Sequence, residues 1–254
     1  MKHCFLHRAL VLLSMVLAFA ATAQTTYVVS VGIERYKYSS ICPPLNCSVA
    51  DARAMSNFFY NYNGSKVFML LNENATRSHI LSVLKNQFSK AKPEDEIIFV
   101  YSGHGTKGGL STYDTRNLAT MVTYDDVQSI MKSSRAKRKV IIADACYSGG
   151  LTLSGTRTGG GKRRQNVNST QVMICTSSRP NEMSLESESM SNSFFMESVL
   201  KAFNGSADAN NDGKVTAREL FNYVSERVVG YSMGRQHPQI WGRFDDNMVI
   251  VKLK

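Results

Sequence analysis

The sequence has little of what membrane-anchored, zinc-binding and nucleotide-binding proteins depend on. After residue 23, no apolar stretch approaches the roughly 20 residues that a bilayer-spanning helix needs. No two cysteines have the spacing of a zinc knuckle, and no histidine pair stands near a cysteine. The Gly-rich segment 154–170 contains lysine, but Gly161 stands where a phosphate-binding loop needs Lys. These absences argue against a membrane anchor, cysteine-bound zinc and a nucleotide site.

Basic residues outnumber acidic ones by 30 to 20, but the excess lacks the features of a nucleic-acid site. Much of it lies in two clusters, Arg135–Lys139 and Arg157–Arg164, with no aromatic residues interleaved for base stacking. Such clusters are more typical of solvated loops than of a binding stripe. We therefore predict no nucleic-acid partner.

The first 23 residues have the pattern of a secretory signal peptide. Lys2 and Arg8 precede the apolar run Ala9–Ala20, and small residues follow up to Ala23. A buried N-terminal helix is the alternative, but no polar face interrupts the run. We expect cleavage near Ala23, a mature chain starting at Gln24 with a net charge of +8, and a secreted or periplasmic location without membrane attachment.

Four cysteines follow the predicted cleavage point. Cys42 and Cys47 are close enough in sequence to form a small disulfide loop in an exported protein, and the sequence leaves open whether they do. Cys175 ends an apolar run and is expected to be buried. Cys146 follows a strand and precedes two glycines, which calls for a different explanation.

Short β-rich runs alternate with helical patterns along the chain, which predicts an α/β fold with a mainly parallel sheet covered on both faces. Several runs are nearly continuous in Val, Ile, Phe and Leu, as in strands buried on both sides. Thr123 with Asp126, and Thr216 with Glu219, form predicted capping pairs at helix starts. The predicted strands are Tyr27–Ile33, Lys66–Leu71, Glu96–Tyr101, Lys139–Ala143, Gln171–Cys175 and Met248–Lys252, and the predicted helices are Val49–Tyr60, Arg77–Ala91, Tyr124–Ser134, Ser193–Phe203 and Ala217–Val229.

We expect residues 24–254 to form a single domain, because about 230 residues suffice for one large core. A basic, Gly-rich loop at 154–170 divides it into a larger part, 24–153, and a smaller part, 171–254.

Two predicted strands end in reactive residues flanked by glycines. One runs into Ser102-Gly103-His104-Gly105, and the other into Asp144-Ala145-Cys146 followed by Gly149-Gly150. In parallel sheets, active sites form beyond the carboxyl ends of strands. If the two strands are neighbours, His104 and Cys146 lie side by side, and a histidine there favours the reactive thiolate.

The motifs YSGHG and DACYSGG resemble those of the caspase-like cysteine peptidases, most closely the metacaspases and their bacterial relatives. Further segments are similar over nearly the whole mature chain: VGIERY, LNCSVADA, LLNENAT, SSRPNEMSLES and RQHPQIWG. The resemblance implies the caspase-like fold, with a six-stranded sheet, and a cysteine-type endopeptidase. It assigns Cys146 as nucleophile and His104 as acid–base partner in a dyad, with the N–H groups of Gly105 and Cys146 holding the oxyanion.

The resemblance also implies the substrate pocket. Metacaspase-like enzymes carry aspartates at the positions of Asp144 and Asp51, and Ser102 matches another pocket position. Ser48 stands where that family often has Cys, which weakens this one assignment. Because paired carboxylates attract a guanidinium or an ammonium group, we predict cleavage of peptides and proteins after Arg or Lys. Alternatively, Asp51 caps or salt-bridges the first helix.

The loop 154–170 offers sites for self-cleavage by such an enzyme. Its exposed basic residues are Arg157, Lys162, Arg163 and Arg164. Cleavage there would split the chain into a larger and a smaller fragment. A merely solvated basic loop explains the same residues equally well.

The segment DANNDGKVTARE has the ligand spacing of a calcium loop, with oxygen-bearing residues at alternating positions and a glycine at the turn. No helix pair brackets it as in a true EF-hand, and a structural turn with a capping box is the alternative. The candidate ligands are Asp208, Asn210, Asp212, Lys214, Thr216 and Glu219.

Other functions remain open at this point. A binding or scaffold protein on the same fold would have lost the chemistry, and a peptidase of a neighbouring branch would cut after Asn. The intact histidine, cysteine and glycines argue against the first, and the acidic pocket against the second. We expect a monomer that needs no cofactor for its chemistry, with calcium as the one candidate ion.

Overall fold

The computed structural model describes residues 24–62, 64–146, 151, 170–185 and 191–253. Within them, a six-stranded sheet has the order β10-β8-β7-β3-β1-β2. Its strands are β1 (Thr26–Gly32), β2 (Ser65–Leu71), β3 (Glu96–Ser102), β7 (Arg138–Asp144), β8 (Gln171–Thr176) and β10 (Gln239–Arg243). All neighbouring pairs are parallel except β10 with β8, which is antiparallel.

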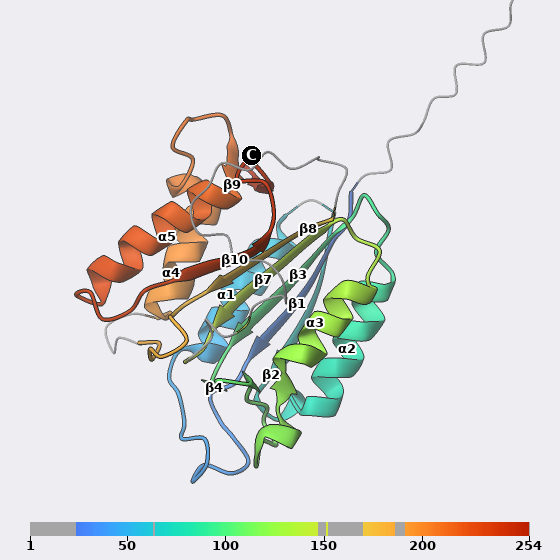
Figure 1. The fold of residues 1–254 in the computed structure, drawn as a ribbon, viewed down its shortest axis with the longest axis vertical. Coiled ribbons are helices and arrows are strands. Elements are labelled where there is room, and N and C mark those ends of the chain that lie inside the picture. Colours follow the sequence, from blue (N-terminus) through green and yellow to red (C-terminus); the bar gives the residue numbers. More distant parts are fainter. Residues whose placement is uncertain (1–23, 63, 147–150, 152–169, 186–190, 254) are drawn as a thin grey trace, which may run out of the picture.

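Helices cover both faces of this sheet (Figure 1). On one face lie α2 (Arg77–Ser89) and α3 (Tyr124–Ser133), and on the other lie α1 (Ser48–Tyr60), α4 (Phe194–Lys201) and α5 (Ala217–Tyr231). The strands supply side chains to both layers in alternation: Val29 and Val31 belong to the core under α2 and α3, and Val28 to the other. Burial on both faces explains why these strands are nearly continuous in apolar residues.

The predicted α/β fold with six strands in the main sheet is therefore confirmed, but one strand was assigned to the wrong sheet. The segment predicted at Met248–Lys252 forms β11 (Val249–Lys252), which pairs antiparallel with β9 (Lys214–Thr216) in a separate two-stranded sheet. The sixth strand of the main sheet is β10, which the sequence analysis did not predict. Its burial alternates along only five residues, so it gives a weak local signal.

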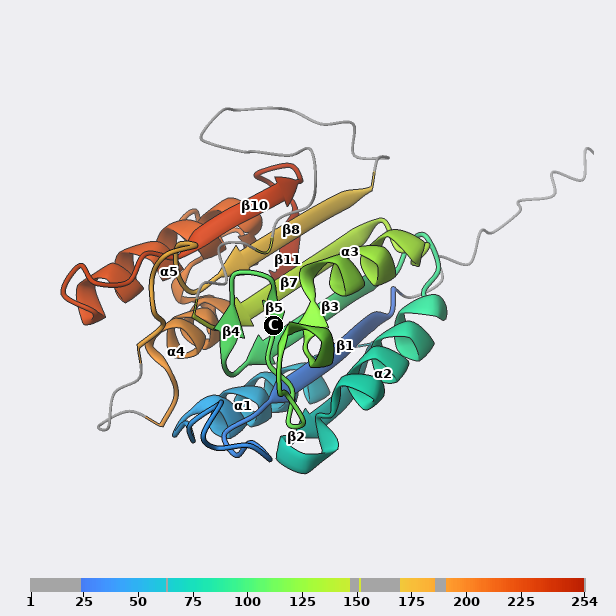
Figure 2. The same ribbon diagram turned by 60° about the horizontal axis from the view of Figure 1, so that its bottom comes forward.

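Short elements gather where the parallel strands end. Directly after β3, the strands β4 (Gly105–Thr106), β5 (Gly109–Leu110) and β6 (Val122–Thr123) form a small antiparallel sheet, which Figure 2 shows in front of the main sheet. The 3₁₀ turns Asn72–Asn74 and Leu118–Thr120 lie in the connections. These segments build the walls around the carboxyl ends of the strands.

Both predicted capping boxes are present. Thr123 accepts a hydrogen bond from the N–H of Asp126 at 3.1 Å, and the Asp126 carboxylate accepts one from the N–H of Thr123 at 3.0 Å. Thr216 and Glu219 repeat the arrangement at the start of α5. The helix predicted at Ser193–Phe203 is confirmed as α4, which continues into a π-helical turn, Ala202–Ser206, where Gly205 adopts a φ of 104°.

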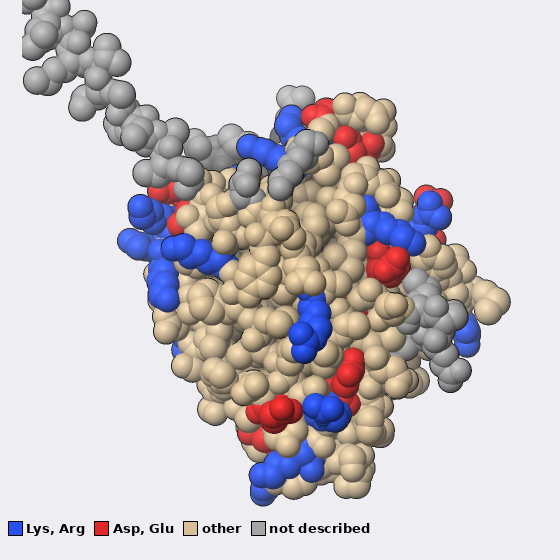
Figure 3. Space-filling model, turned by 180° about the vertical axis from the view of Figure 1, so that it is seen from behind, with Lys and Arg blue, Asp and Glu red and all other residues tan. Residues whose placement is uncertain are grey.

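On the face shown in Figure 3, several Lys and Arg side chains gather at the left edge, and elsewhere Lys and Arg lie near Asp and Glu. Among the described residues, no helix is long and apolar enough to cross a bilayer.

Candidate active site

The reactive residues follow two strands that are direct neighbours. β3 and β7 run parallel, with Ser102 opposite Asp144 at their carboxyl ends. The N–H of Gly103 donates to the carbonyl of Asp144 at 3.1 Å and so extends the pairing beyond the strands. His104 and Cys146, which come next in each chain segment, line the same cavity. The structure thus brings together the two residues that the sequence analysis selected.

A backbone carbonyl fixes the orientation of the His104 ring. Its Nε2 lies 2.7 Å from the carbonyl oxygen of Pro43, which can only accept, so Nε2 carries the proton. In the neutral ring, Nδ1 is therefore the nitrogen free to take a proton. Tyr36 supports the residue as well: its hydroxyl accepts from the His104 N–H at 2.8 Å, and the two ring centroids are 5.1 Å apart.

Pro43 was not selected from the sequence. Its role depends on a main-chain carbonyl, which every residue possesses, so residue identity carried no signal. The Pro43 contact adds to the predicted dyad a third, neutral group that orients the histidine.

The glycine after the histidine is required by close packing. A Cβ atom on Gly105 would lie 2.7 Å from the carbonyl oxygen of Cys146 and 2.9 Å from the Cβ of Ala145, closer than van der Waals contact allows. Glycine therefore lets the two strand exits approach each other, with the backbone of Gly105 against that of the cysteine. On the other side, the N–H of Ala145 donates to the Ser177 hydroxyl at 3.1 Å.

A cavity of about 220 Å³ opens beside the histidine and the cysteine. Asp144, which is 4% exposed, lines it, and the hydroxyl of Ser184 donates a short hydrogen bond to its Oδ1. None of the described residues that line it is Lys or Arg; they are Leu45, Ser48, Ser102, Gly103, His104, Asp144, Cys146, Met183, Ser184, Leu185 and Ser193. The cavity is therefore acidic at one wall and otherwise neutral.

Asp51 lies directly behind this cavity rather than in its wall. Its carboxylate is fully buried and accepts hydrogen bonds from Ser102 Oγ at 2.8 Å, Asn192 Nδ2 at 3.0 Å and the N–H of Ser193 at 3.0 Å. Burial, reinforced by the nearby charge of Asp144, raises the pKa of Asp51 to about 7 despite these bonds. Two carboxylates thus share one end of the sheet, with Ser102 between Asp51 and the cavity.

The outer wall of the cavity is held in place by Gln236, which is fully buried. Its Nε2 donates to the carbonyl of Ser177 at 2.9 Å and to Ser184 Oγ at 3.2 Å, and its Oε1 accepts from the N–H of Leu185 at 2.9 Å. The adjacent His237 binds Glu182 through both its N–H and Nδ1. The described part of SSRPNEMSLES, residues 177–185, is therefore joined to RQHPQIWG in one structural unit.

A sequence model of the caspase domain matches residues 26–249, which is nearly all of the part described above. The chain belongs to this family. The caspase domain is a cysteine peptidase domain, so the family accounts for a cysteine and a histidine at the ends of neighbouring strands.

Two solved structures resemble it over most of its length. Caspase-1 of Spodoptera frugiperda has a TM-score of 0.66 at 17% identity, covering 91% of each chain. The protein GSU0716 of Geobacter sulfurreducens has a TM-score of 0.62 at 13% identity, covering 91% of this chain and all of the other. No curated protein sequence matches significantly. At these identities the likeness concerns the fold alone.

The other cysteines of the caspase domain have ordinary structural surroundings. The thiol of Cys42 contacts Ser111 Oγ at 3.8 Å, so the structure does not pair it with Cys47. Cys175 is buried in the core, and burial raises its thiol pKa to about 12. Neither thiol is poised for nucleophilic attack.

The acidic loop after α4 is folded on itself. Asp208 accepts from the N–H groups of Asp212 and Gly213 at 3.1 and 3.0 Å, and Asn210 accepts from that of Asp212 at 3.0 Å. Glu219 is engaged by Thr216 in the capping box. Among the described residues, no group of three or more His, Cys, Asp or Glu is arranged to hold a metal ion. Calcium binding at this loop stays a prediction.

Two further predictions fall outside the described residues. The signal peptide, 1–23, and the self-cleavage candidates Arg157, Lys162, Arg163 and Arg164 lie in segments about which the structure says nothing.

Proposed function

We propose that this protein is an exported cysteine endopeptidase that cleaves peptide bonds after Arg or Lys. The observation that carries the specificity is the cavity beside Cys146 and His104. It is lined by Asp144, has Asp51 directly behind it, and has no cationic side chain among its described lining residues. A guanidinium or ammonium group is the complement of such a site, whereas the neutral amide of Asn carries no positive charge to match its carboxylates.

The proposed chemistry uses the hydrogen-bond direction at His104. With Nε2–H held by Pro43, Nδ1 accepts the thiol proton of Cys146. The resulting thiolate attacks the carbonyl carbon of the substrate, and the imidazolium then donates this proton to the leaving amine as the C–N bond breaks. Water attacks the thioester, Nδ1 takes a proton from it, and the C–S bond breaks to release the acid and restore the cysteine.

The carbonyl oxygen of the substrate becomes negatively charged during both steps, and hydrogen-bond donors are needed to stabilise it. The N–H groups of Gly105 and Cys146 are proposed for this role, which agrees with the close approach of the two backbone segments. The carbonyl of Pro43 stabilises the imidazolium, as the buried carboxylate does in other peptidases, but without adding a charge.

The test is hydrolysis of matched fluorogenic peptides ending in Arg, Lys, Asn or Asp. Residues 24–254 and the Cys146→Ala variant are compared under reducing conditions, with and without calcium. We expect turnover after Arg and Lys alone, which is lost in the variant. Turnover after Asn or Asp would refute the pocket assignment, and silence from the folded, reduced protein would favour a binding protein or a latent zymogen.

Self-cleavage is the second element of the proposal. Incubated wild-type protein should gain new N-termini after Arg157, Lys162, Arg163 or Arg164, because the enzyme would cut after basic residues of its own chain. N-terminal sequencing beside Cys146→Ala decides it, since identical intact chains in both samples would exclude self-processing.

A further inference from the structure

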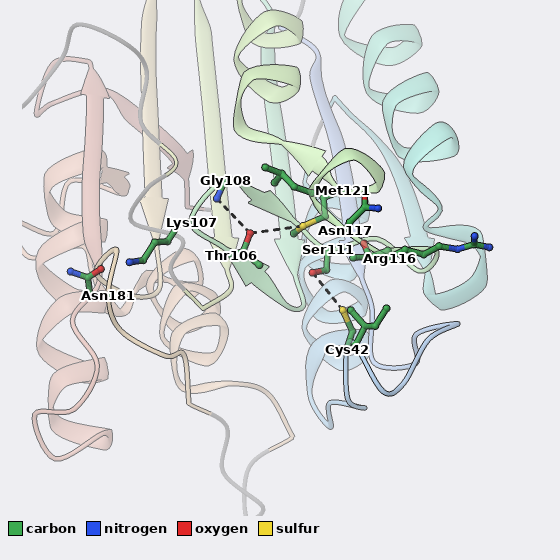
Figure 4. Close-up of a pocket in the computed structure, with 12 residues that line it drawn as sticks. Cys42, Thr106, Lys107, Gly108, Ser111, Arg116, Asn117, Met121 and Asn181 are labelled. Atoms are coloured by element: carbon green, nitrogen blue, oxygen red, sulfur yellow. Dashed lines mark hydrogen bonds between the residues drawn. The ribbon is translucent and has the colours of Figure 1, made fainter.

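A second and larger cavity, of about 740 Å³, lies next to the candidate active site. Figure 4 shows Lys107 and Asn181 on one side of it, and Cys42, Ser111 and Arg116 on the other. None of the roles proposed above uses this space. Its described lining residues are Ile41, Cys42, Thr106, Lys107, Gly108, Ser111, Thr115, Arg116, Asn117, Leu118, Met121 and Asn181.

The two cavities are lined by consecutive parts of the same chain segments. Ile41 and Cys42 line the large cavity, whereas Leu45 and Ser48, a few residues later, line the acidic cavity. In the same way, Thr106–Gly108 line the large cavity, whereas Ser102–His104 line the acidic one. Pro43 falls between the two cavities in the first segment, and its partner His104 is the last residue that lines the acidic cavity in the second.

The segment that follows β8, residues 181–185, also contributes to both cavities. Asn181 lines the large cavity, and Met183, Ser184 and Leu185 line the acidic one. Three segments from distant parts of the sequence therefore each contribute residues to both cavities. The two cavities are therefore neighbours, and His104 and Cys146 line the acidic one.

The large cavity differs from the acidic one in chemical character. Ile41 and Leu118 are 50% and 54% exposed, and they are among only five large apolar residues that are exposed in the described part of the chain. Both line this cavity, together with Cys42 and Met121. Exposed apolar side chains that gather in a concavity indicate a binding site for an apolar group.

The proposed reaction decides which part of a substrate reaches each cavity. The side chain before the cut enters the acidic cavity, and His104 protonates the amine of the residue after the cut. That residue must therefore lie on the His104 side, away from Asp144, where the large cavity begins. We propose that the large cavity binds an apolar side chain, such as Leu or Met, of the substrate residue that follows the cut.

This assignment rests on the proposed function, so the experiment reports on the two separately. Peptidyl-Arg-coumarin, which has no amino acid after the cut, measures the proposed peptidase activity. Internally quenched peptides with one common sequence up to Arg then carry Leu, Met, Gly, Ser or Asp after it. We expect kcat/KM for Leu and Met to exceed that for Gly by about tenfold, as is usual for an apolar side chain entering an apolar pocket.

Two variants link this preference to the cavity. Ile41→Ser and Leu118→Ser shorten half-exposed side chains, so both proteins should fold. In each we expect the Leu-to-Gly ratio of kcat/KM to fall to less than about half its wild-type value. Met233→Ser is the matched control, because Met233 is 81% exposed and lines neither cavity; its ratio should equal that of the wild type.

Three results would overturn the assignment. Equal kcat/KM for all residues after the cut, with peptidyl-Arg-coumarin hydrolysed, would remove it and leave the proposed peptidase intact. A Leu and Met preference that both cavity variants retain would place the apolar site elsewhere. No turnover of the coumarin peptide by folded, reduced protein would remove the proposed function and this assignment with it.

Discussion

Two groups of acidic residues in this protein have opposite surroundings. Asp51 and Asp144 are buried at the end of the main sheet, where Asp51 is bonded by Ser102 and Asn192 from distant parts of the chain. Asp208 and Asp212 lie in a surface loop, where Asp208 accepts hydrogen bonds from backbone N–H groups four and five residues further on.

This difference in surroundings determines whether a carboxylate destabilises the folded state. In the loop they satisfy nearby amides and remain close to solvent, so they shape a turn at little expense. At the sheet end, burial and mutual repulsion raise the pKa of Asp51 to about 7, which is unfavourable for the folded state. The proposed binding of a cationic side chain would give this buried acid pair a function, and the following predictions test the contrast, from the largest effect to the smallest.

Replacing Asp144 with Ala should have the largest effect. Loss of a buried charge partner costs about 2–5 kcal/mol, so kcat/KM for Arg and Lys peptides should fall by about 30-fold or more. Asp125→Ala is the control, since Asp125 is an exposed acid at the start of α3 and should leave the rate unchanged. Full retained activity in Asp144→Ala would refute the acidic pocket.

Asp51→Asn separates function from stability. Asn can still accept from Asn192 and the Ser193 N–H, and can donate to the Ser102 hydroxyl, so the packing is preserved. We expect about a tenfold loss in kcat/KM for Arg peptides, because one charge is removed near the pocket. The thermal midpoint at pH 8 should equal or exceed that of the wild type, since an ionised buried carboxylate is no longer present. A large loss of stability would instead mark Asp51 as a structural residue.

The pH dependence follows from the same group. Because the folded-state pKa of Asp51 is raised from 3.8 to about 7, the folded protein holds this proton more tightly than the unfolded chain does. The free energy of unfolding therefore falls as pH rises from about 4 to about 7, because the unfolded chain releases this proton first. Conversely, kcat/KM for Arg peptides should rise through pH 7 as the pocket gains charge. All other titratable groups are present in both proteins, so the difference between the wild-type and Asp51→Asn profiles isolates Asp51.

Changes at the acidic loop should be the smallest. Asp208→Ala removes two hydrogen bonds to backbone amides in a partly exposed turn and should cost about 1 kcal/mol in unfolding free energy, with no effect on hydrolysis. Glu226→Ala, at an exposed position of α5, is the control. If the loop is purely structural, EDTA will leave the thermal midpoint unchanged, whereas a midpoint that rises with added calcium would show a bound ion.

Local patterns in the sequence were enough to predict most of the fold. Five of the six strands of the main sheet, all five helices and both capping boxes were predicted close to their observed limits, because apolar periodicity and capping residues act over a few neighbouring positions. The strand β10 was missed, and β11 was expected among the main-sheet strands. Which strands pair depends on contacts between distant segments, and periodicity within one segment does not report them.

The same division applies to the candidate site. Glycines around a histidine and a cysteine at two strand ends were visible in the sequence, and adjacent parallel strands brought them together. The Pro43 carbonyl, the anchoring of the cavity wall by Gln236 and the large apolar cavity were not visible. Each of these arises from groups that are common in any sequence and gain a role only by their position.

The sequence by itself determined the α/β class, the order of most elements, and the histidine and cysteine at two strand ends, because short-range patterns encode each of these. Tertiary structure alone decided that Asp51 is buried against Ser102 with a raised pKa, that Pro43 orients His104, and that consecutive parts of the same segments line two chemically different cavities. Burial, pKa and cavity shape depend on which distant segments exclude water from a site, and only the folded chain brings those segments together.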